Sequence, residues 1–128
     1  MSYFEDVREF HIQILGMDDT TPHELEPSLM RERFEFIAEE MEELVESYSM
    51  GDMTGMADAL ADLVYVALGT AHRMGIPFDE VWAAVQKANM TKVRGTTKRG
   101  HAIDAVKPVD WVGPETAITE ALYRANKS

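Results

Sequence analysis

The sequence predicts an all-α protein: a four- to five-helix bundle with antiparallel central helices, assembling as a homo-oligomer. Apolar residues recur at helical spacing along most of the chain, and glycine and proline interrupt them at helix-length intervals. No segment shows the alternation of a strand bounded by hairpin turns. The length of 128 residues fits one domain, 1–128, and short connections between the central helices favour antiparallel packing.

The first half of the chain divides into two predicted helices and a loop. A helix over about residues 3–15 ends at Gly16, and two prolines in residues 17–27 indicate a loop. Ser28 can cap the long helix that follows, which Gly51 ends. Its apolar stripe consists of Leu29, Phe34, Ile37, Met41, Leu44 and Tyr48.

A third helix begins at a cap supplied by Asp52 or Thr54 and runs through Met74 to Gly75. The nearest candidate for a strand, residues 63–68, lies inside this helical pattern.

The remaining chain is predicted to hold two shorter helices and a loop. A fourth helix covers about residues 78–91. The region of about 93–113 lacks periodicity and is interpreted as a basic, mobile loop. Pro114 suits the first turn of a short helix over residues 115–125.

Composition excludes several classes of protein. Hydrophobic residues at 45% and charged residues at 27% are typical of a soluble globular domain. The absence of cysteine excludes disulfides, zinc-thiolate sites, iron–sulfur clusters and thiol nucleophiles. No apolar stretch approaches the roughly 20 residues of a membrane span, and the first residues lack the apolar run of a signal peptide. We therefore expect a cytoplasmic protein that does not bind membranes.

The charges are distributed unevenly. Residues 1–60 carry 16 acidic and 3 basic side chains, whereas residues 61–128 carry 7 acidic and 9 basic ones. A net charge of −11 argues against a nucleic-acid polymer as the partner, because phosphate neutralisation drives such binding. A local basic cluster can still hold a small phosphorylated ligand; it consists of Lys92, Arg94, Lys98, Arg99 and Lys107.

The long helix carries six glutamates between residues 35 and 46, and their mutual repulsion destabilises it. Like charges three and four residues apart repel. Glu35, Glu42 and Glu46 lie opposite the apolar stripe and are interpreted as a solvated face. A rotation of about 100° per residue instead places Glu40 and Glu43 at the edge of the stripe.

Two aspartates lie one turn apart on the third helix, which is apolar almost all round. No lysine or arginine occurs between Asp58 and Thr70 to pair with them. Burial of an unpaired carboxylate costs several kcal/mol. Asp58 can instead satisfy amides of the first helical turn. Asp62 is too deep in the helix for that, so it needs a cation, an arginine from elsewhere or a raised pKa.

Antiparallel packing brings the Glu40/Glu43 pair opposite the Asp58/Asp62 pair. Four carboxylates without histidine or cysteine suit a hard cation, Mg²⁺ or alternatively Mn²⁺. No histidine has a glutamate three residues before it, unlike the di-iron bundles. A magnesium site with open positions typically holds phosphates.

These residues resemble the all-α nucleoside triphosphate pyrophosphohydrolases, the MazG-like superfamily that includes dimeric dUTPases and phosphoribosyl-ATP pyrophosphohydrolase. Its EExxE motif matches residues 39–43, and Asp62 matches the last residue of its ExxD motif. Ala59 stands where that motif has glutamate, and Asp58 resembles a substitute. Residues 87–92 resemble an Asn-Met-Ser-Lys segment of one subgroup, and the similarity extends over about residues 7–118.

The resemblance implies hydrolysis of a nucleoside triphosphate to the monophosphate and pyrophosphate. It implies that Glu40, Glu43, Asp58 and Asp62 bind one or more metal ions. Glu39 is interpreted either as the group that accepts the proton of the attacking water or as a solvent-facing glutamate.

Five further residues are assigned to the substrate, each with a plainer alternative. Asn89 can bind a base or sugar edge, or simply end its helix. Lys92 can meet the triphosphate, or be solvated. Arg94 and Lys107, with Lys98, can close over phosphates or belong to an ordinary loop. Tyr65 can be a ligand contact or core.

The apolar surface of the third and fourth helices is too large to be covered within 128 residues, which predicts a homo-oligomer. The resemblance implies that this assembly is a homodimer or homotetramer. Two other functions stay open: a phosphoribosyl-ATP pyrophosphohydrolase, and a non-catalytic helical protein whose acidic helix binds a basic partner.

Overall fold

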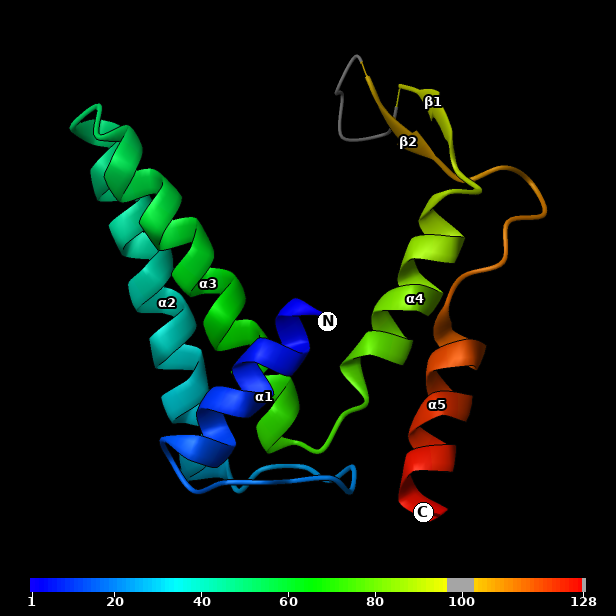
Figure 1. Ribbon diagram of the computed structural model, residues 1–128. Coiled ribbons are helices and arrows are strands. Elements are labelled where there is room, and N and C mark those ends of the chain that lie inside the picture. The colour runs from blue at the N-terminus through cyan, green and yellow to red at the C-terminus, as the bar shows by residue number, and fades with distance from the viewer. Residues whose placement is uncertain (97–102, 128) are drawn as a thin grey trace. The chain divides into compact units, whose positions relative to one another are not determined.

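The computed structural model describes residues 1–96 and 103–127, and its helices and strands are labelled in Figure 1. Contacts divide the chain into an N-terminal unit, Met1–Phe78, and a C-terminal unit, Asp79–Ser128, and each is described by itself. Helices dominate both units, which confirms the predicted all-α class. Within the described residues, no helix combines the length and apolarity needed to cross a membrane.

The N-terminal unit contains α1 (Tyr3–Gln13), α2 (Pro27–Ser49) and α3 (Met53–Arg73). α1 begins with a capping box that the sequence analysis did not identify. The Ser2 hydroxyl accepts the Glu5 amide at 3.1 Å, and the Glu5 carboxylate accepts the Ser2 amide at 3.3 Å. Two orphan amides of the first turn are thereby satisfied.

The start of α2 corrects the prediction of a Ser28 cap. The N-cap is Glu26, whose side chain makes no capping hydrogen bond, and Pro27 occupies the first turn. Proline suits that position because its fixed φ angle is helical and its missing amide would have had no partner. Ser28 therefore lies inside the helix.

A short turn makes α2 and α3 antiparallel neighbours, and Figure 1 shows them side by side. Gly51 has a φ angle of +67°, the left-handed conformation that ends a helix at low cost only with glycine. The Asp52 carboxylate then accepts the Gly55 amide at 3.0 Å, which confirms Asp52 as the cap. The predicted antiparallel central pair is thus confirmed.

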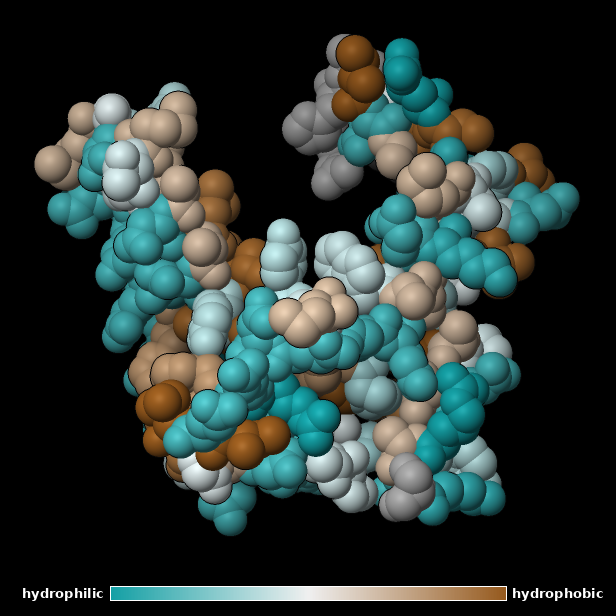
Figure 2. All heavy atoms as spheres, in the orientation of Figure 1, coloured by the Kyte–Doolittle hydropathy of each residue, from teal (hydrophilic) through white to brown (hydrophobic). Residues whose placement is uncertain are grey.

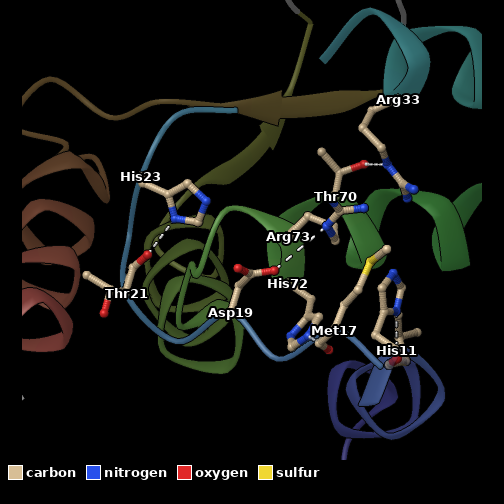
Figure 3. Close-up of polar contacts among 10 residues, drawn as sticks. His11, Met17, Asp19, Thr21, His23, Arg33, Thr70, His72 and Arg73 are labelled. Atoms are coloured by element: carbon tan, nitrogen blue, oxygen red, sulfur yellow. Dashed lines mark hydrogen bonds and ion pairs between the residues drawn. The ribbon is translucent and has the colours of Figure 1, made fainter. Parts of the chain in front are cut away.

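The core of the N-terminal unit is built around two buried histidines, His11 of α1 and His72 of α3, whose ring centroids lie 5.1 Å apart (Figure 3). Nδ1 of His11 lies 2.9 Å from the Val7 carbonyl oxygen, and Nε2 of His72 lies 3.0 Å from the Met17 carbonyl oxygen. A carbonyl can only accept, so each of these nitrogens carries the proton and donates.

Arg33 joins α2 to α3 beside these histidines (Figure 3). Its Nε donates to the Thr70 hydroxyl at 2.9 Å, and its Nη2 donates to the Val66 carbonyl at 3.0 Å. Burial lowers the pKa of Arg33, but a guanidinium stays charged in proteins. Arg33 is therefore a structural cation of the helix interface.

The His11 site predicts loss of stability in acid. Burial, followed by repulsion from nearby cations, lowers the pKa of His11 below its ordinary 6.5. Its contribution to stability is complete above pH 6.5 and is lost as pH falls from there towards the lower folded-state pKa. Binding of one proton can change the free energy of unfolding by at most about 1.4 kcal/mol per pH unit.

Urea unfolding at about pH 7.5 and about pH 5.5 measures this effect, because the pH slope reports differential proton binding. His11→Asn should reduce the acid-induced loss, whereas His23→Asn, at an exposed histidine, should leave it unchanged. An unchanged loss in His11→Asn would contradict the prediction.

Gly69 lies against the same cluster, where a β-carbon would be 2.8 Å from Cε1 of His11 and 2.9 Å from Nη2 of Arg33. In an open helix, Gly→Ala stabilises by about 1 kcal/mol. Here overpacking should dominate, and Gly69→Ala should lower the free energy of unfolding by about 1–3 kcal/mol. Urea unfolding measures the sign of this change in the free energy of unfolding. A stabilised Gly69→Ala protein would mean that His11 and Arg33 move aside at little cost.

The C-terminal unit corrects three predicted boundaries. α4 covers Phe78–Asn89, two residues shorter at its end than predicted, and α5 covers Glu115–Lys127, two residues longer. Part of the predicted loop is an antiparallel hairpin of β1 (Val93–Gly95) and β2 (Asp104–Val106). Three-residue strands are too short to show a period-2 pattern. Lys98 and Arg99 lie outside the described residues.

Candidate metal centre

The α2–α3 pair brings three of the predicted metal ligands together. Glu40 and Glu43 of α2 and Asp62 of α3 each offer a carboxylate oxygen, and these oxygens all lie within 4.8 Å of one another. We call this group the acidic triad. It forms because Glu40 and Glu43 are one turn apart on one helix, and the short turn after Ser49 places α3 antiparallel beside them.

One oxygen of the acidic triad has no partner. Oε2 of Glu40 is buried, and no hydrogen-bond donor reaches it among residues 1–96 and 103–127. Buried carboxylate oxygens are normally paired or bound to a cation. The donors are oxygens alone, which suits Mg²⁺ or Mn²⁺. The residues of the triad therefore fit a hard divalent ion.

The triad is electrostatically strained. Desolvation, followed by repulsion from Glu43 and Asp62, raises the pKa of Glu40, with smaller contributions from a hydrogen bond with Glu43 and from Asp58. Within the described chain, no lysine or arginine forms an ion pair with any triad carboxylate. Arg33, the half-buried arginine of α2, is bound to Thr70 and Val66 instead.

Asp58 lies outside the acidic triad. Its side chain is exposed, one turn before Asp62 on α3, yet its charge contributes to the raised pKa of Glu40. Ala59, which stands where the resemblance expects a glutamate, is only 2% exposed and belongs to the core. Assignment of Asp58 as a metal ligand therefore stays a prediction.

Two other predicted residues lie near the triad in sequence. Glu39 is exposed on α2 directly before Glu40, and its role as proton acceptor stays a prediction. Tyr65 is 39% exposed and packs edge-on against Phe10 of α1, with ring centroids 5.7 Å apart. That contact gives Tyr65 a packing role, and contact with a substrate stays a prediction.

The remaining predicted residues belong to the C-terminal unit. Asn89 is exposed at the end of α4, and Arg94 is exposed on β1, paired in register with Ala105 of β2. The ammonium groups of Lys92 and Lys107 both lie over the ring of Trp111. The structure thus brings two of these four residues together.

Sequence reasoning missed Trp111 as an organising residue and missed the histidine core. The indole Nε1 of Trp111 donates to the Ala88 carbonyl at 3.0 Å, a bond to a backbone atom that no sequence pattern announces. The available signal was Lys107, four residues before Trp111 in the basic segment.

Comparison with known families adds independent information. Residues 7–89 match the sequence model of a family described as phosphoribosyl-ATP pyrophosphohydrolase. The match covers well over half of the chain, includes the whole acidic triad and ends at the last residue of α4. Lys92, Arg94 and Lys107 lie beyond it. No curated protein matches the chain.

Proposed function

Because this chain belongs to the phosphoribosyl-ATP pyrophosphohydrolase family, a group of hydrolases acting on phosphoric anhydride bonds, we propose a specific reaction for it. It hydrolyses a nucleoside triphosphate between the α and β phosphates, giving the monophosphate and pyrophosphate, with Mg²⁺ as cofactor. The observation that carries the proposal is the acidic triad with its unpartnered, buried Glu40 oxygen. The superfamily resemblance read from the motifs is confirmed by the family match.

Glu40, Glu43 and Asp62 would hold the metal, and Asp58 is proposed as a further ligand. When bound, Mg²⁺ neutralises phosphate oxygens and lowers the pKa of water. The chain's part is to keep three carboxylates converged, none of which forms an ion pair with a lysine or arginine of residues 1–96 and 103–127. Mn²⁺ prefers similar oxygen ligands and is expected to substitute.

Glu39 is proposed to accept the proton of the attacking water. It is exposed and precedes Glu40 by one residue, so a water molecule can reach its carboxylate. A general base needs to be within hydrogen-bond reach of the proton it removes. Substitution by glutamine would separate this role from that of a solvent-facing glutamate.

Substrate contacts are proposed for Asn89, Lys92, Arg94, Lys107 and Tyr65. The amide of Asn89 offers a paired donor and acceptor for a base or sugar edge. The three basic residues suit a triphosphate, because charge-assisted hydrogen bonds to phosphate are about twice as strong as neutral ones. All five side chains are at least partly exposed.

Phosphoribosyl-ATP is the second candidate substrate, favoured by the description of the matching family itself. Both substrates present a phosphoric anhydride to the same carboxylates. A non-catalytic acidic protein is less well supported, because basic partners bind exposed carboxylates and leave the buried Glu40 oxygen unexplained.

A nucleotide panel tests the reaction. We expect Mg²⁺- or Mn²⁺-dependent release of pyrophosphate from one or more of dUTP, dCTP and dATP, with product analysis identifying the monophosphate. Faster release from phosphoribosyl-ATP than from every nucleoside triphosphate would establish the second candidate. Release of orthophosphate, or no hydrolysis of any substrate, would contradict the proposed reaction.

Homo-oligomerisation is also proposed, as a dimer or tetramer. None of the 23 residues of α2 is buried, and several apolar side chains of α2 and α3 are about half exposed or more, among them Phe34, Met41, Val45, Leu60 and Val64. Figure 2 shows apolar side chains interspersed with hydrophilic ones over the α2–α3 pair. A second copy of the chain packed against these side chains would remove their apolar surface from water. A monomer in sedimentation velocity at micromolar concentration would contradict it.

A further inference from the structure

Trp111 fastens the segment after β2 to the end of α4. Its indole Nε1 donates to the Ala88 carbonyl at 3.0 Å, and its own amide donates to the Pro108 carbonyl at 3.0 Å. Ala88 is buried, with 7% of its surface exposed, so the anchoring point is part of the core of the C-terminal unit. The indole ring is therefore held at a defined place.

Two lysines from different parts of the chain lie against this ring. Nζ of Lys92, three residues after α4, is 5.3 Å from the ring centroid, and Nζ of Lys107, directly after β2, is 5.0 Å from it. Each contact is attractive, because the face of an indole carries negative charge. Because both ammonium groups lie about 5 Å from the same ring centroid, they are no more than about 10 Å apart.

The positive charge of these two lysines is not balanced by a carboxylate. Among residues 1–96 and 103–127, no acidic side chain forms an ion pair with Lys92 or Lys107. Asp110 is adjacent to Trp111 in sequence and forms no ion pair with either lysine. An indole face is a weak substitute for a counter-ion, so an anion would stabilise the pair.

We propose that Trp111 is a positioning residue that presents Lys92 and Lys107 as a paired site for a polyphosphate chain. We call the three residues the Trp111 clamp. A polyphosphate fits better than a single carboxylate or monophosphate, because its charged oxygens are spaced along a chain and can meet two separated ammonium groups. That the natural ligand is a nucleotide triphosphate rests on the proposed function.

Tryptophan fluorescence can report binding at the clamp directly. The chain contains two tryptophans, so a Trp82→Phe protein leaves Trp111 as the sole indole. Inorganic tripolyphosphate, added with EDTA at low ionic strength, should change Trp111 emission in a saturable way as the ammonium groups turn to the anion. Added salt should weaken binding, because exposed charges are screened. A linear, non-saturating response would overturn the proposal.

Charge removal identifies the residues. Lys92→Gln and Lys107→Gln should each weaken tripolyphosphate binding about tenfold, as expected for loss of one charge-assisted contact. Lys127→Gln is the matched control, because its ammonium lies 4.6 Å from the ring centroid of Tyr123 and makes the same kind of contact elsewhere. An equal loss in Lys127→Gln would show nonspecific attraction and overturn the clamp.

Trp111 itself is tested by calorimetric titration, which needs no indole. Trp111→Leu should weaken tripolyphosphate binding about tenfold although both lysines remain, since the ring no longer holds them. Trp111→Phe keeps an aromatic face and should recover part of that loss. Full affinity in Trp111→Leu would overturn the positioning role.

The experiments can refute the Trp111 clamp and the proposed hydrolysis independently of each other. Tripolyphosphate binding in EDTA requires no metal, so it is measured independently of hydrolysis. Saturable binding without hydrolysis of any nucleotide would leave the clamp and refute the proposed function. Hydrolysis without saturable binding at Trp111 would refute the clamp alone.

Discussion

Asp62→Asn should reduce Mg²⁺-dependent pyrophosphate release by at least about a hundredfold, because charge stabilisation by a bound metal contributes several kcal/mol to the transition state. Asparagine has nearly the shape of aspartate and keeps one oxygen, but it removes the negative charge that the acidic triad contributes to a cation. Asp62 is half-buried and belongs to the triad. The measurement is kcat/KM with the best substrate of the nucleotide panel.

The control for Asp62→Asn is Glu35→Gln, an equivalent change from carboxylate to amide on α2. Glu35 is exposed, lies outside the acidic triad and matches the solvated face inferred from the sequence. It should retain nearly full activity. Far-UV circular dichroism should show unchanged helix content in both variants. An active Asp62→Asn protein would refute its assignment as a metal ligand.

The helical framework was predictable because the residues that begin and end its helices act through local contacts. Gly16, Gly51 and Gly75 follow the first three helices, and each adopts a positive φ angle that favours glycine. Asp52 caps α3 through a bond within three residues. Such signals need no knowledge of distant contacts, so the antiparallel α2–α3 pair followed directly from the sequence.

The acidic triad was predictable for a different reason. Asp62 is a carboxylate on a largely apolar helix, and Glu40 and Glu43 lie at the edge of an apolar stripe. Desolvation of unpaired carboxylates at these positions is unfavourable in free energy without a cation, and this indicated a metal site. The sequence favoured Asp62 over Asp58, because Asp58 can satisfy amides of the first helical turn and Asp62 lies too deep in the helix for that. In the structure Asp62 is half-buried and Asp58 is exposed.

The hairpin and the Trp111 contacts depend on long-range geometry. β1 and β2 pair across residues 96–103, and Trp111 donates to Ala88, 23 residues earlier in the chain. The histidine core is similar, because His72 donates to the Met17 carbonyl, 55 residues away. Hydrogen bonds to backbone carbonyls do not depend on the residue type of the acceptor, so they cannot be predicted from composition or spacing.

Glu40→Gln should raise the melting temperature of the metal-free protein and abolish its stabilisation by Mg²⁺. Without metal, the Glu40 carboxylate is desolvated and repelled by Glu43 and Asp62, as the raised pKa of Glu40 records. Glutamine removes that repulsion at nearly constant volume. With metal, the unmodified protein should gain on the order of 10 °C when Mg²⁺ exceeds its Kd a hundredfold, by mass action.

Glu42→Gln is the matched control, since Glu42 is exposed on the same helix and outside the acidic triad. It should keep the full rise in melting temperature with Mg²⁺. Thermal unfolding followed by circular dichroism, with and without Mg²⁺ at constant ionic strength, separates specific binding from screening. Equal Mg²⁺ protection of Glu40→Gln and the unmodified protein would show that the buried oxygen of Glu40 contributes nothing to metal binding, and the triad would then lose the observation on which its assignment depends.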